Sequence, residues 1–305
     1  MLYSTTTPEQ KRVKLREILA SGTLQQFPGA FSPLSARLIE EKGFPGVYIS
    51  GAVLANDLGL PDIGLTTLTE VATRAGQIAR MTELPAIVDA DTGFGEAMNV
   101  ARTIQELENA GLAGMHIEDQ VNPKRCGHLD GKSVVDLDTA LQRVRAAADA
   151  RRDPNFLIMA RTDIRATGEG AAGLDAAVER AKALVEAGAD AIFPEAMGSI
   201  EEFKAIRDAV TVPVLANMTE FGKSRLFTAQ ELASVGINMV IYPVTLLRIA
   251  MGAAERTLDS IRADGTQEAQ VENMLTRSRL YELVDYEAYN GFDTSVFNFQ
   301  VPGRY

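Results

Sequence analysis

The sequence predicts an α/β protein of the (β/α)8 TIM-barrel type, in which eight parallel strands alternate with helices. Four segments with helical spacing each end at a glycine that is followed at once by a short apolar run. This is the pattern of a capped helix that leads directly into a strand. Four further apolar runs bring the number of expected strands to eight. Such alternation is typical of parallel sheets with helical crossovers, and eight units close a barrel.

The expected strands are spread along most of the chain. The glycine-capped helices lead into GVYISG, LAGMHIEDQ, ADAIFPEA and INMVIYP, and the remaining strands are FPGAF near residue 29, PAIVDAD, FLIMARTD and PVLANMTE. A doubly wound open sheet is the alternative, but no G-x-G-x-x-G motif follows the first strand, so the usual dinucleotide signal is absent. We expect a single domain with an N-terminal helical segment at 1–26, a barrel at 27–248 and a helical extension at 249–305.

Amino-acid composition and net charge exclude several classes of function. The 305 residues are 46% hydrophobic, which supports a sizeable core, and carry a formal net charge of −11, which argues against nonspecific binding to nucleic acid. A single cysteine excludes an intrachain disulfide, and the N-terminal segment lacks the apolar core of a signal peptide. No apolar run is long enough to span a bilayer. These features predict a cytoplasmic protein that binds neither nucleic acid nor membranes.

Five of the expected strands end in polar or aromatic side chains. Residues two apart in a strand share a face, and the carboxyl ends of barrel strands form the mouth where active sites lie. We therefore expect these side chains to converge at the mouth. The pairs are Asp89 and Asp91, His116 and Glu118, Arg161 and Asp163, Phe193 and Glu195, and Asn217 and Thr219.

The acids among these side chains predict a metal site. Convergent carboxylates without cysteine or histidine at zinc spacing favour a hard divalent cation, Mg²⁺ in the first place and Mn²⁺ as a substitute. Asp89, Asp91 and Glu118 are the expected ligands, directly or through water, although such acids can also cap the helices that follow. Arg161 would either orient a substrate carboxylate by bidentate contact or form a salt bridge with an acid in the same mouth.

The segment from 114 to 132 concentrates reactive side chains. Its loop contains the only cysteine, Cys126, next to Lys124 and Arg125 and close to His128. Neighbouring cations lower the pKa of a thiol and favour the thiolate, but the thiol could instead donate its proton as a general acid. A buried, unreactive cysteine is the alternative. The charged, glycine-containing surroundings favour the reactive interpretation.

Two aromatic groups lie at the expected mouth. Tyr48 precedes a glycine-containing loop at another strand end and could transfer a proton near the metal, although a structural tyrosine would look the same in the sequence. His116 is interpreted as a supporting group rather than a metal ligand, because a single histidine in an apolar strand is weak support for a ligand.

Six motifs resemble those of the isocitrate lyase and phosphoenolpyruvate mutase superfamily. They are KRCGH at 124–128, VDADTGFG at 88–95, HIEDQ at 116–120, MARTD at 159–163, FPEA at 193–196 and NMTEFG at 217–222. Mutases and decarboxylases of the superfamily generally lack the cysteine of the KRCGH loop, so Cys126 indicates a lyase. Isocitrate lyases typically have a tryptophan where this chain has Phe193, an S-P-S-F-N-W segment where it has NMTEFG, and large insertions that this chain lacks.

The resemblance implies Mg²⁺-assisted cleavage of a tricarboxylate, 2-methylisocitrate, into pyruvate and succinate, the splitting step of the methylcitrate route of propionate catabolism. In that reaction Tyr48 would remove the hydroxyl proton, Cys126 would protonate the carbanion, and Arg161, Lys124 and His128 would hold the negative charge. The match places Asp62 near the metal. It also implies that substrate-binding positions are Ser50, Gly51, Ala52, Gly127, Arg161, Glu195, Asn217, Met218, Thr219, Arg248 and Arg277.

The family usually has S-G-G at 50–52, so Ala52 departs from its pattern. The resemblance further implies a homotetramer in which C-terminal helices exchange between neighbours. Two other classes of function remain open. One is a lyase for a related acid such as isocitrate or dimethylmalate, or a superfamily isomerase or mutase. The other is a noncatalytic binding protein built on an inactivated barrel.

Overall fold

All eight expected strands are present in the computed structural model, which describes residues 4–124, 132–168, 170–222 and 224–298. The first strand lies slightly before the expected FPGAF segment. The strands are β1 Gln25–Pro28, β2 Val47–Ile49, β3 Ala86–Asp89, β4 Gly114–Glu118, β5 Leu157–Thr162, β6 Ala191–Pro194, β7 Leu215–Asn217 and β8 Met239–Tyr242.

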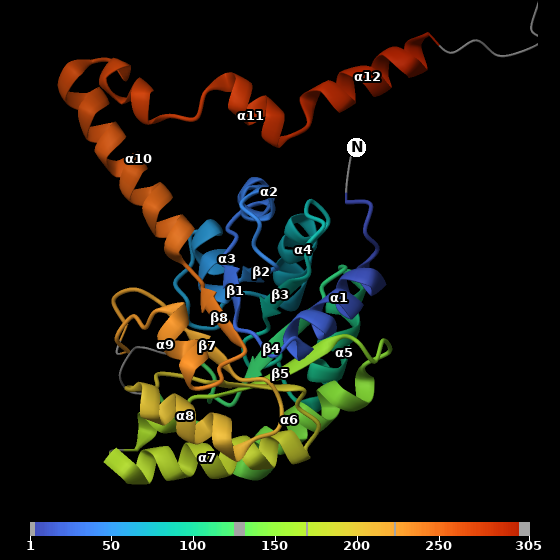
Figure 1. Cartoon of the computed structure of the whole chain (residues 1–305), viewed down its shortest axis with the longest axis vertical. Coiled ribbons are helices and arrows are strands. Elements are labelled where there is room, and N and C mark those ends of the chain that lie inside the picture. The colour runs from blue at the N-terminus through green and yellow to red at the C-terminus, as the bar shows by residue number, and fades with distance from the viewer. Residues whose placement is uncertain (1–3, 125–131, 169, 223, 299–305) are drawn as a thin grey trace, which may run out of the picture. The chain divides into compact units, whose positions relative to one another are not determined.

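Every strand pairing is parallel, and together the pairings close a barrel. The strands β2-β3-β4-β5-β6 form one hydrogen-bonded sheet and β1-β8-β7 form another. Single parallel bridges, Gly29 with Tyr48 and Ile192 with Val214, join β1 to β2 and β6 to β7. The expected (β/α)8 fold is therefore confirmed, and the open-sheet alternative is wrong. Figure 1 shows the strands at the centre of the barrel with α4 to α8 around them.

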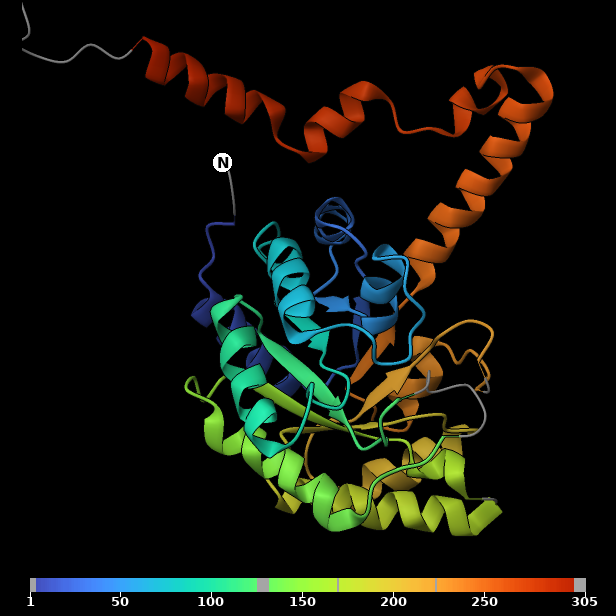
Figure 2. The same cartoon turned by 180° about the vertical axis from the view of Figure 1, so that it is seen from behind.

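Helices alternate with these strands, as Figure 2 shows from the other side. Their bounds are α1 Pro8–Ala20, α2 Pro33–Glu41, α3 Gly51–Asp57, α4 Leu68–Ala79, α5 Ala97–Asn109, α6 Leu137–Ala150, α7 Gly170–Glu186, α8 Ile200–Ala209, α9 Ala229–Ser234, α10 Thr245–Asp264, α11 Arg277–Leu283 and α12 Tyr286–Phe297. Short 3-10 turns occur at Ile164–Thr167 and Glu268–Asn273.

The four glycines expected to end helices do so in the left-handed conformation. Gly43, Gly111, Gly188 and Gly236 have φ between 78° and 111°, a backbone region that other residues enter only at a cost. Each of these glycines reverses the chain between a helix and the next strand. The regular spacing of helices and strands in the sequence follows from these turns.

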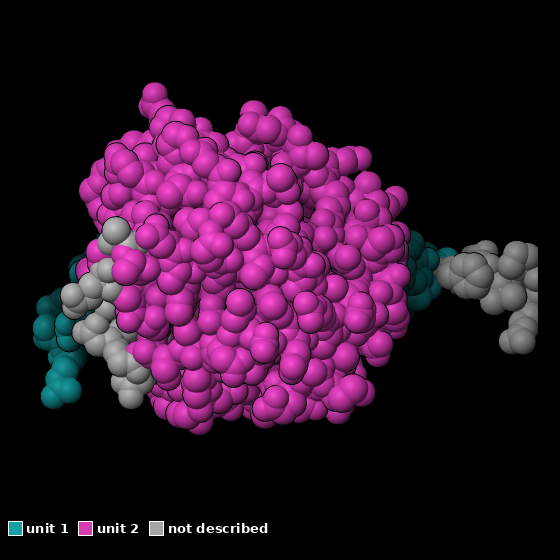
Figure 3. All heavy atoms as spheres, turned by 90° about the horizontal axis from the view of Figure 1, so that it is seen from below, with its two compact units in different colours: residues 1–5, 248–305 teal, residues 6–247 magenta. Residues whose placement is uncertain are grey.

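Contacts within the chain divide it into two units, coloured separately in Figure 3. One unit is Thr6–Leu247 and contains the whole barrel. The other comprises residues 1–5 and 248–305 and contains most of α10 together with α11 and α12. Among the residues that the structure describes, no helix is both long and apolar enough to cross a membrane.

Helix α1 lies against the amino-terminal end of the barrel. Leu15 and Leu19 are buried in the same apolar cluster as the inward-facing strand residues. Lys11 donates hydrogen bonds to carbonyl groups at the end of α4 and in the loop that follows it, and Arg12 and Arg16 donate to carbonyl groups just before β4 and β5. Because α1 covers this end, the opposite, carboxyl end is left to form a site.

We expect truncation of Leu15 to loosen the covered end. Leu15→Ala should lower the free energy of unfolding by about 2–5 kcal/mol, because it leaves a cavity beside a fully buried cluster. Glu17→Ala on the exposed side of the same helix is the control and should change it by less than about 0.5 kcal/mol. Denaturant unfolding monitored by circular dichroism measures both. Equal losses would show that Leu15 does not seal the barrel.

Candidate active site

The expected polar side chains converge where the strands end. Asp89, Glu118 and Asn217 are the last residues of β3, β4 and β7, and Arg161 is the next-to-last residue of β5. Asp163, Glu195 and Thr219 lie just beyond the ends of β5, β6 and β7. Except for the partly buried Asn217, these side chains are buried. The barrel therefore gathers charged groups at one mouth.

Asp89 and Asp91 converge for a reason that differs from the expected one. Only Asp89 belongs to a strand, and Asp91 lies in the following loop with a left-handed φ of 45°. The backbone N–H of Asp91 donates to Asp89 Oδ1, and the N–H of Gly51 donates to Asp89 Oδ2. A Cβ atom on Gly51 would lie 2.8 Å from Asp89 Oδ2 and 3.3 Å from Asp91 Oδ1. Both carboxylates therefore pack closely against Gly51, where an added Cβ atom would crowd them.

Lys124 stands among these acids. Its Nζ lies 2.5 Å from Asp62 Oδ1 and 2.7 Å from Asp91 Oδ1, and the side chain is buried. Burial alone would favour the neutral amine, but the negative charges of Asp89, Glu118 and Asp91 raise the pKa of Lys124 well above its usual value. The ammonium group is therefore charged. It supplies a positive charge among these acids.

Arg161 is surrounded by three carboxylates. Its guanidinium lies 2.9 Å from Asp163, 3.1 Å from Glu195 and 3.2 Å from Glu118, and it lies over the ring of Phe193 at 5.0 Å from the centroid. Burial opposes its charge, but these acids raise the pKa of Arg161 well above its usual value. The salt bridge expected within the mouth is therefore present, and contact with a substrate carboxylate stays a prediction.

The acids of this network outnumber its cations among the described residues. The carboxylates are Asp62, Asp89, Asp91, Glu118, Asp163 and Glu195, and the cations are Lys124, Lys132 and Arg161. With all six acids ionised, the three cations would leave a formal charge of −3. Both oxygens of Glu118 are buried without a hydrogen bond in the described chain, and burial raises the pKa of this carboxyl well above its usual value.

This donor set fits a divalent cation in its chemistry. Carboxylate oxygens are the ligands that Mg²⁺ and Mn²⁺ prefer, and an added double positive charge would offset most of the excess. No three acidic, histidine or cysteine side chains of the described chain already lie in a finished coordination geometry. The assignment of Asp89, Asp91, Glu118 and Asp62 to a metal therefore stays a prediction.

Tyr48 and His116 form a layer beneath the charged groups. They come from β2 and β4, and Phe193 from β6 continues the layer; alternate strands supply such layers in (β/α)8 barrels. Tyr48 Oη lies 2.7 Å from His116 Nε2, and the two rings stack with centroids 5.8 Å apart. Burial lowers the pKa of His116 to about 4 and raises that of Tyr48 well above its usual value.

Several expected site residues are placed differently or lie outside the description. Cys126, Gly127 and His128 fall outside the described residues. The Met218 side chain packs in the cluster between strands and helices, and its sulfur accepts the N–H of Phe227. It therefore turns away from the mouth, and only its backbone could contact a substrate.

The remaining expected residues divide between the two units. Ser50 is the N-cap residue of α3, and Gly51 and Ala52 begin that helix beside Asp89. Arg248 in α10 and Arg277 at the start of α11 belong to the second unit. The roles of these two arginines stay predictions.

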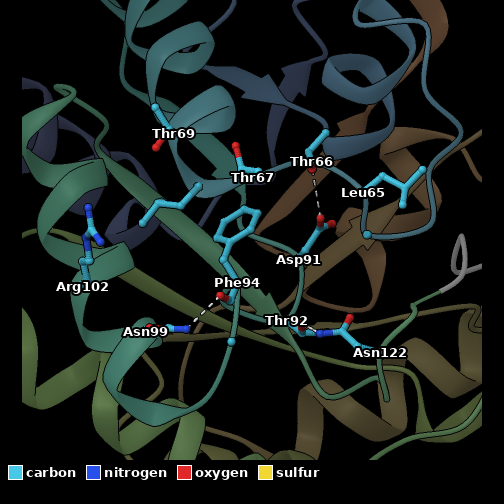
Figure 4. A pocket seen from close by; sticks show the side chains of 13 residues that line it. Leu65, Thr66, Thr67, Thr69, Asp91, Thr92, Phe94, Asn99, Arg102 and Asn122 are labelled. Atoms are coloured by element: carbon cyan, nitrogen blue, oxygen red, sulfur yellow. Dashed lines mark hydrogen bonds between the residues drawn. The ribbon is translucent and has the colours of Figure 1, made fainter.

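Sequence reasoning missed Thr66, whose side chain contacts the carboxylate of Asp91. Its hydroxyl lies 3.4 Å from Asp91 Oδ2 and is buried. Together they line a cavity of about 540 Å³ that threonine, asparagine and glycine residues mostly surround, with Phe94 and Asn122 at its walls (Figure 4). A run of threonines between a loop and a helix carries no signal that would identify Thr66 in the sequence.

The fold and the mouth together define a class: (β/α)8-barrel proteins with an acid-rich, cation-stabilised site at the carboxyl ends of the strands. A family model described as "Phosphoenolpyruvate phosphomutase" matches residues 15–262. The chain belongs to this family.

Named relatives in the family are similar over nearly the whole chain. "Probable 2-methylisocitrate lyase 2" of Corynebacterium glutamicum is 59% identical, with 98% of this chain and 96% of that protein covered. The "2-methylisocitrate lyase" of Escherichia coli is 47% identical, with 87% and 88% covered. Among solved structures, oxaloacetate acetylhydrolase with a difluorinated inhibitor aligns with a TM-score of 0.89 at 34% identity, covering 97% of this chain and 100% of the other.

We expect removal of the Arg161 charge to destabilise the protein strongly. Arg161→Met leaves three buried carboxylates without their shared cation, a change that typically costs about 3–5 kcal/mol of unfolding free energy. The matched control is Arg225→Met. Like Arg161, Arg225 lies over a phenylalanine ring and forms a salt bridge, but it pairs with a single carboxylate and is largely exposed.

The control substitution should cost at most about 1 kcal/mol. Denaturant unfolding of both variants at neutral pH measures the difference. Losses of equal size would mean that the buried acids do not depend on Arg161.

Proposed function

We propose that this chain is a carbon–carbon lyase that cleaves 2-methylisocitrate into pyruvate and succinate. The observation that carries the proposal is its identity of 46–59% over more than nine-tenths of the chain to proteins named as lyases of this substrate. A solved 2,3-dimethylmalate lyase is less similar, at 32% identity and a TM-score of 0.86. We propose that this reaction serves the methylcitrate route of propionate catabolism.

The proposal includes Mg²⁺, with Mn²⁺ as its substitute. Three observations support it: the formal charge of −3, the two carboxylates that face Gly51, and the Glu118 oxygens without a hydrogen bond. Asp89, Asp91 and Glu118 would hold the ion, with Asp62 beside them. When bound, such an ion supplies Lewis-acid stabilisation of charge on the α-hydroxyl and carboxylate oxygens of the substrate.

Two proton transfers complete the cleavage. Tyr48, as the base, takes the proton of the substrate hydroxyl, the carbon–carbon bond breaks, and its electron pair stays on the succinate half as a carbanion while pyruvate gains its carbonyl. Cys126 donates its thiol proton to that carbanion and becomes the thiolate. Lys124, His128 and Arg161 would stabilise the developing negative charge. Because burial raises the pKa of Tyr48, its anionic form needs a hydrogen-bond donor.

Phe193 is proposed to set the preference for the methylated substrate. Its ring is fully buried, with its neighbour His116 edge-on at 5.1 Å and Arg161 above it. A tryptophan at this position would take more of the space beneath the mouth. A pocket that recognises one additional methyl group gains only about 1–3 kcal/mol from it.

The second unit is proposed to make contacts between copies of this chain in a homotetramer, with exchanged C-terminal helices. Large apolar side chains along α10 and α12 are exposed, with Ile249, Leu258 and Phe292 each about two-thirds exposed and Phe297 88% exposed. Helices with such surfaces usually pack against a partner. Sedimentation of the full chain tests this proposal, and a monomer at micromolar concentration would contradict it. We propose a cytoplasmic location for the same enzyme.

We expect kcat/KM for 2-methylisocitrate to exceed that for isocitrate by roughly 10- to 200-fold in the presence of Mg²⁺. The physical reason is that Phe193 leaves room for the methyl group, which then adds apolar contact. Release of pyruvate from one substrate and of glyoxylate from the other measures the two rates. Equal values, or a preference for isocitrate, would contradict the proposed substrate. A third assay with 2,3-dimethylmalate tests the related lyase activity.

A further inference from the structure

The direction of the hydrogen bond between His116 and Tyr48 depends on which imidazole nitrogen carries the proton. His116 is 0% exposed, and its ring nitrogens differ in their partners, which decides where a proton is held. Nε2 lies 2.7 Å from Tyr48 Oη, and either atom could donate. The surroundings of the two nitrogens distinguish the possibilities.

Nδ1 of His116 is buried and has no hydrogen-bond partner among the described residues. The ring lies nearly parallel to that of Tyr48, which it meets through Nε2, and meets Phe193 edge-on at an interplanar angle of 76°; it belongs to the inner layer of the barrel. An unpaired buried N–H is rarer and costlier than an unpaired acceptor. The apolar side of the ring therefore favours Nδ1 without a proton.

The other side of the ring gives independent support. Asp89 Oδ1 lies 3.7 Å from His116 Nε2. This is too long for a hydrogen bond, but a carboxylate at that distance attracts an N–H and repels a bare lone pair. Both sides of the ring therefore place the proton on Nε2, from which it can be donated only to Tyr48 Oη.

We propose that His116 is a positioning residue that donates a hydrogen bond from Nε2 to Tyr48 Oη and thereby turns the tyrosine's own proton, or its lone pair once ionised, toward the substrate. Because Nε2 is the donor, the tyrosine hydroxyl cannot donate to His116. Its proton is available to the mouth, where Asp89 and Arg161 lie. When Tyr48 is ionised, the same hydrogen bond stabilises the phenolate that the cleavage requires.

The kinetic consequence of this arrangement rests on the proposed function, but the tautomer does not. The chain has two histidines, so His128→Gln leaves His116 as the only imidazole. Two-bond ¹H–¹⁵N correlation spectra of this protein, without substrate, show which nitrogen carries the proton. The proposal expects the Nε2–H form. An Nδ1–H form would overturn it, whether or not the protein cleaves 2-methylisocitrate.

Two substitutions distinguish a role of His116 as a hydrogen-bond donor from a role in packing alone. In His116→Gln the amide nitrogen can replace Nε2–H, whereas the shorter side chain of His116→Asn reaches only the position of Nδ1. Asparagine should lower kcat roughly 100-fold with little change in KM, and glutamine should retain activity within about tenfold of the unaltered chain. Near-ultraviolet circular dichroism checks that both variants fold alike. Equal losses in the two variants would contradict the donor role.

Discussion

Among the described residues, six carboxylates and only three cations meet at the mouth of the barrel, and the surrounding structure keeps them there. Lys124 and Arg161 each bridge more than one acid, yet Glu118 still has no hydrogen bond in the described chain. Buried charge of this kind costs free energy unless an ion or a ligand compensates it. A protein that retains it gains a site that favours divalent cations and the anionic substrates that bind with them.

The barrel provides the rigidity that such a site requires. The inner layer of Tyr48, His116 and Phe193 packs directly beneath the acids, and α1 covers the other end with Leu15 and Leu19. The ring contacts of this layer and the hydrogen bond between Tyr48 and His116 fix the orientation of both side chains. Among the described residues, Nδ1 of His116 has no hydrogen-bond partner because the layer that fills the barrel leaves little room for one.

Most of the fold could be predicted because it depends on local signals, and part of the site could not because it depends on backbone detail. Glycines before four of the strands specify the turns that lead into them, and the other four strands were identified as short apolar runs. The convergence of Asp89 and Asp91 was expected from strand alternation, but it arises from a left-handed residue after the strand. The Met218 side chain packs outside the strands, as alternation with the inward Asn217 predicts, and its expected role in substrate binding stays a prediction. Thr66 acts through a tertiary contact that no sequence spacing encodes.

The acids around Gly51 are proposed to hold a divalent cation, and electron paramagnetic resonance of added Mn²⁺ measures that binding. We expect one Mn²⁺ per chain, displaced by Mg²⁺, and an affinity that falls at least roughly tenfold in Gly51→Ala, whose methyl group would crowd both aspartates. Gly291→Ala, where nothing lies within 4 Å, is the control and should bind as the unaltered chain does. Absence of Mn²⁺ binding by the unaltered chain, or binding that Gly51→Ala leaves unchanged, would contradict the account.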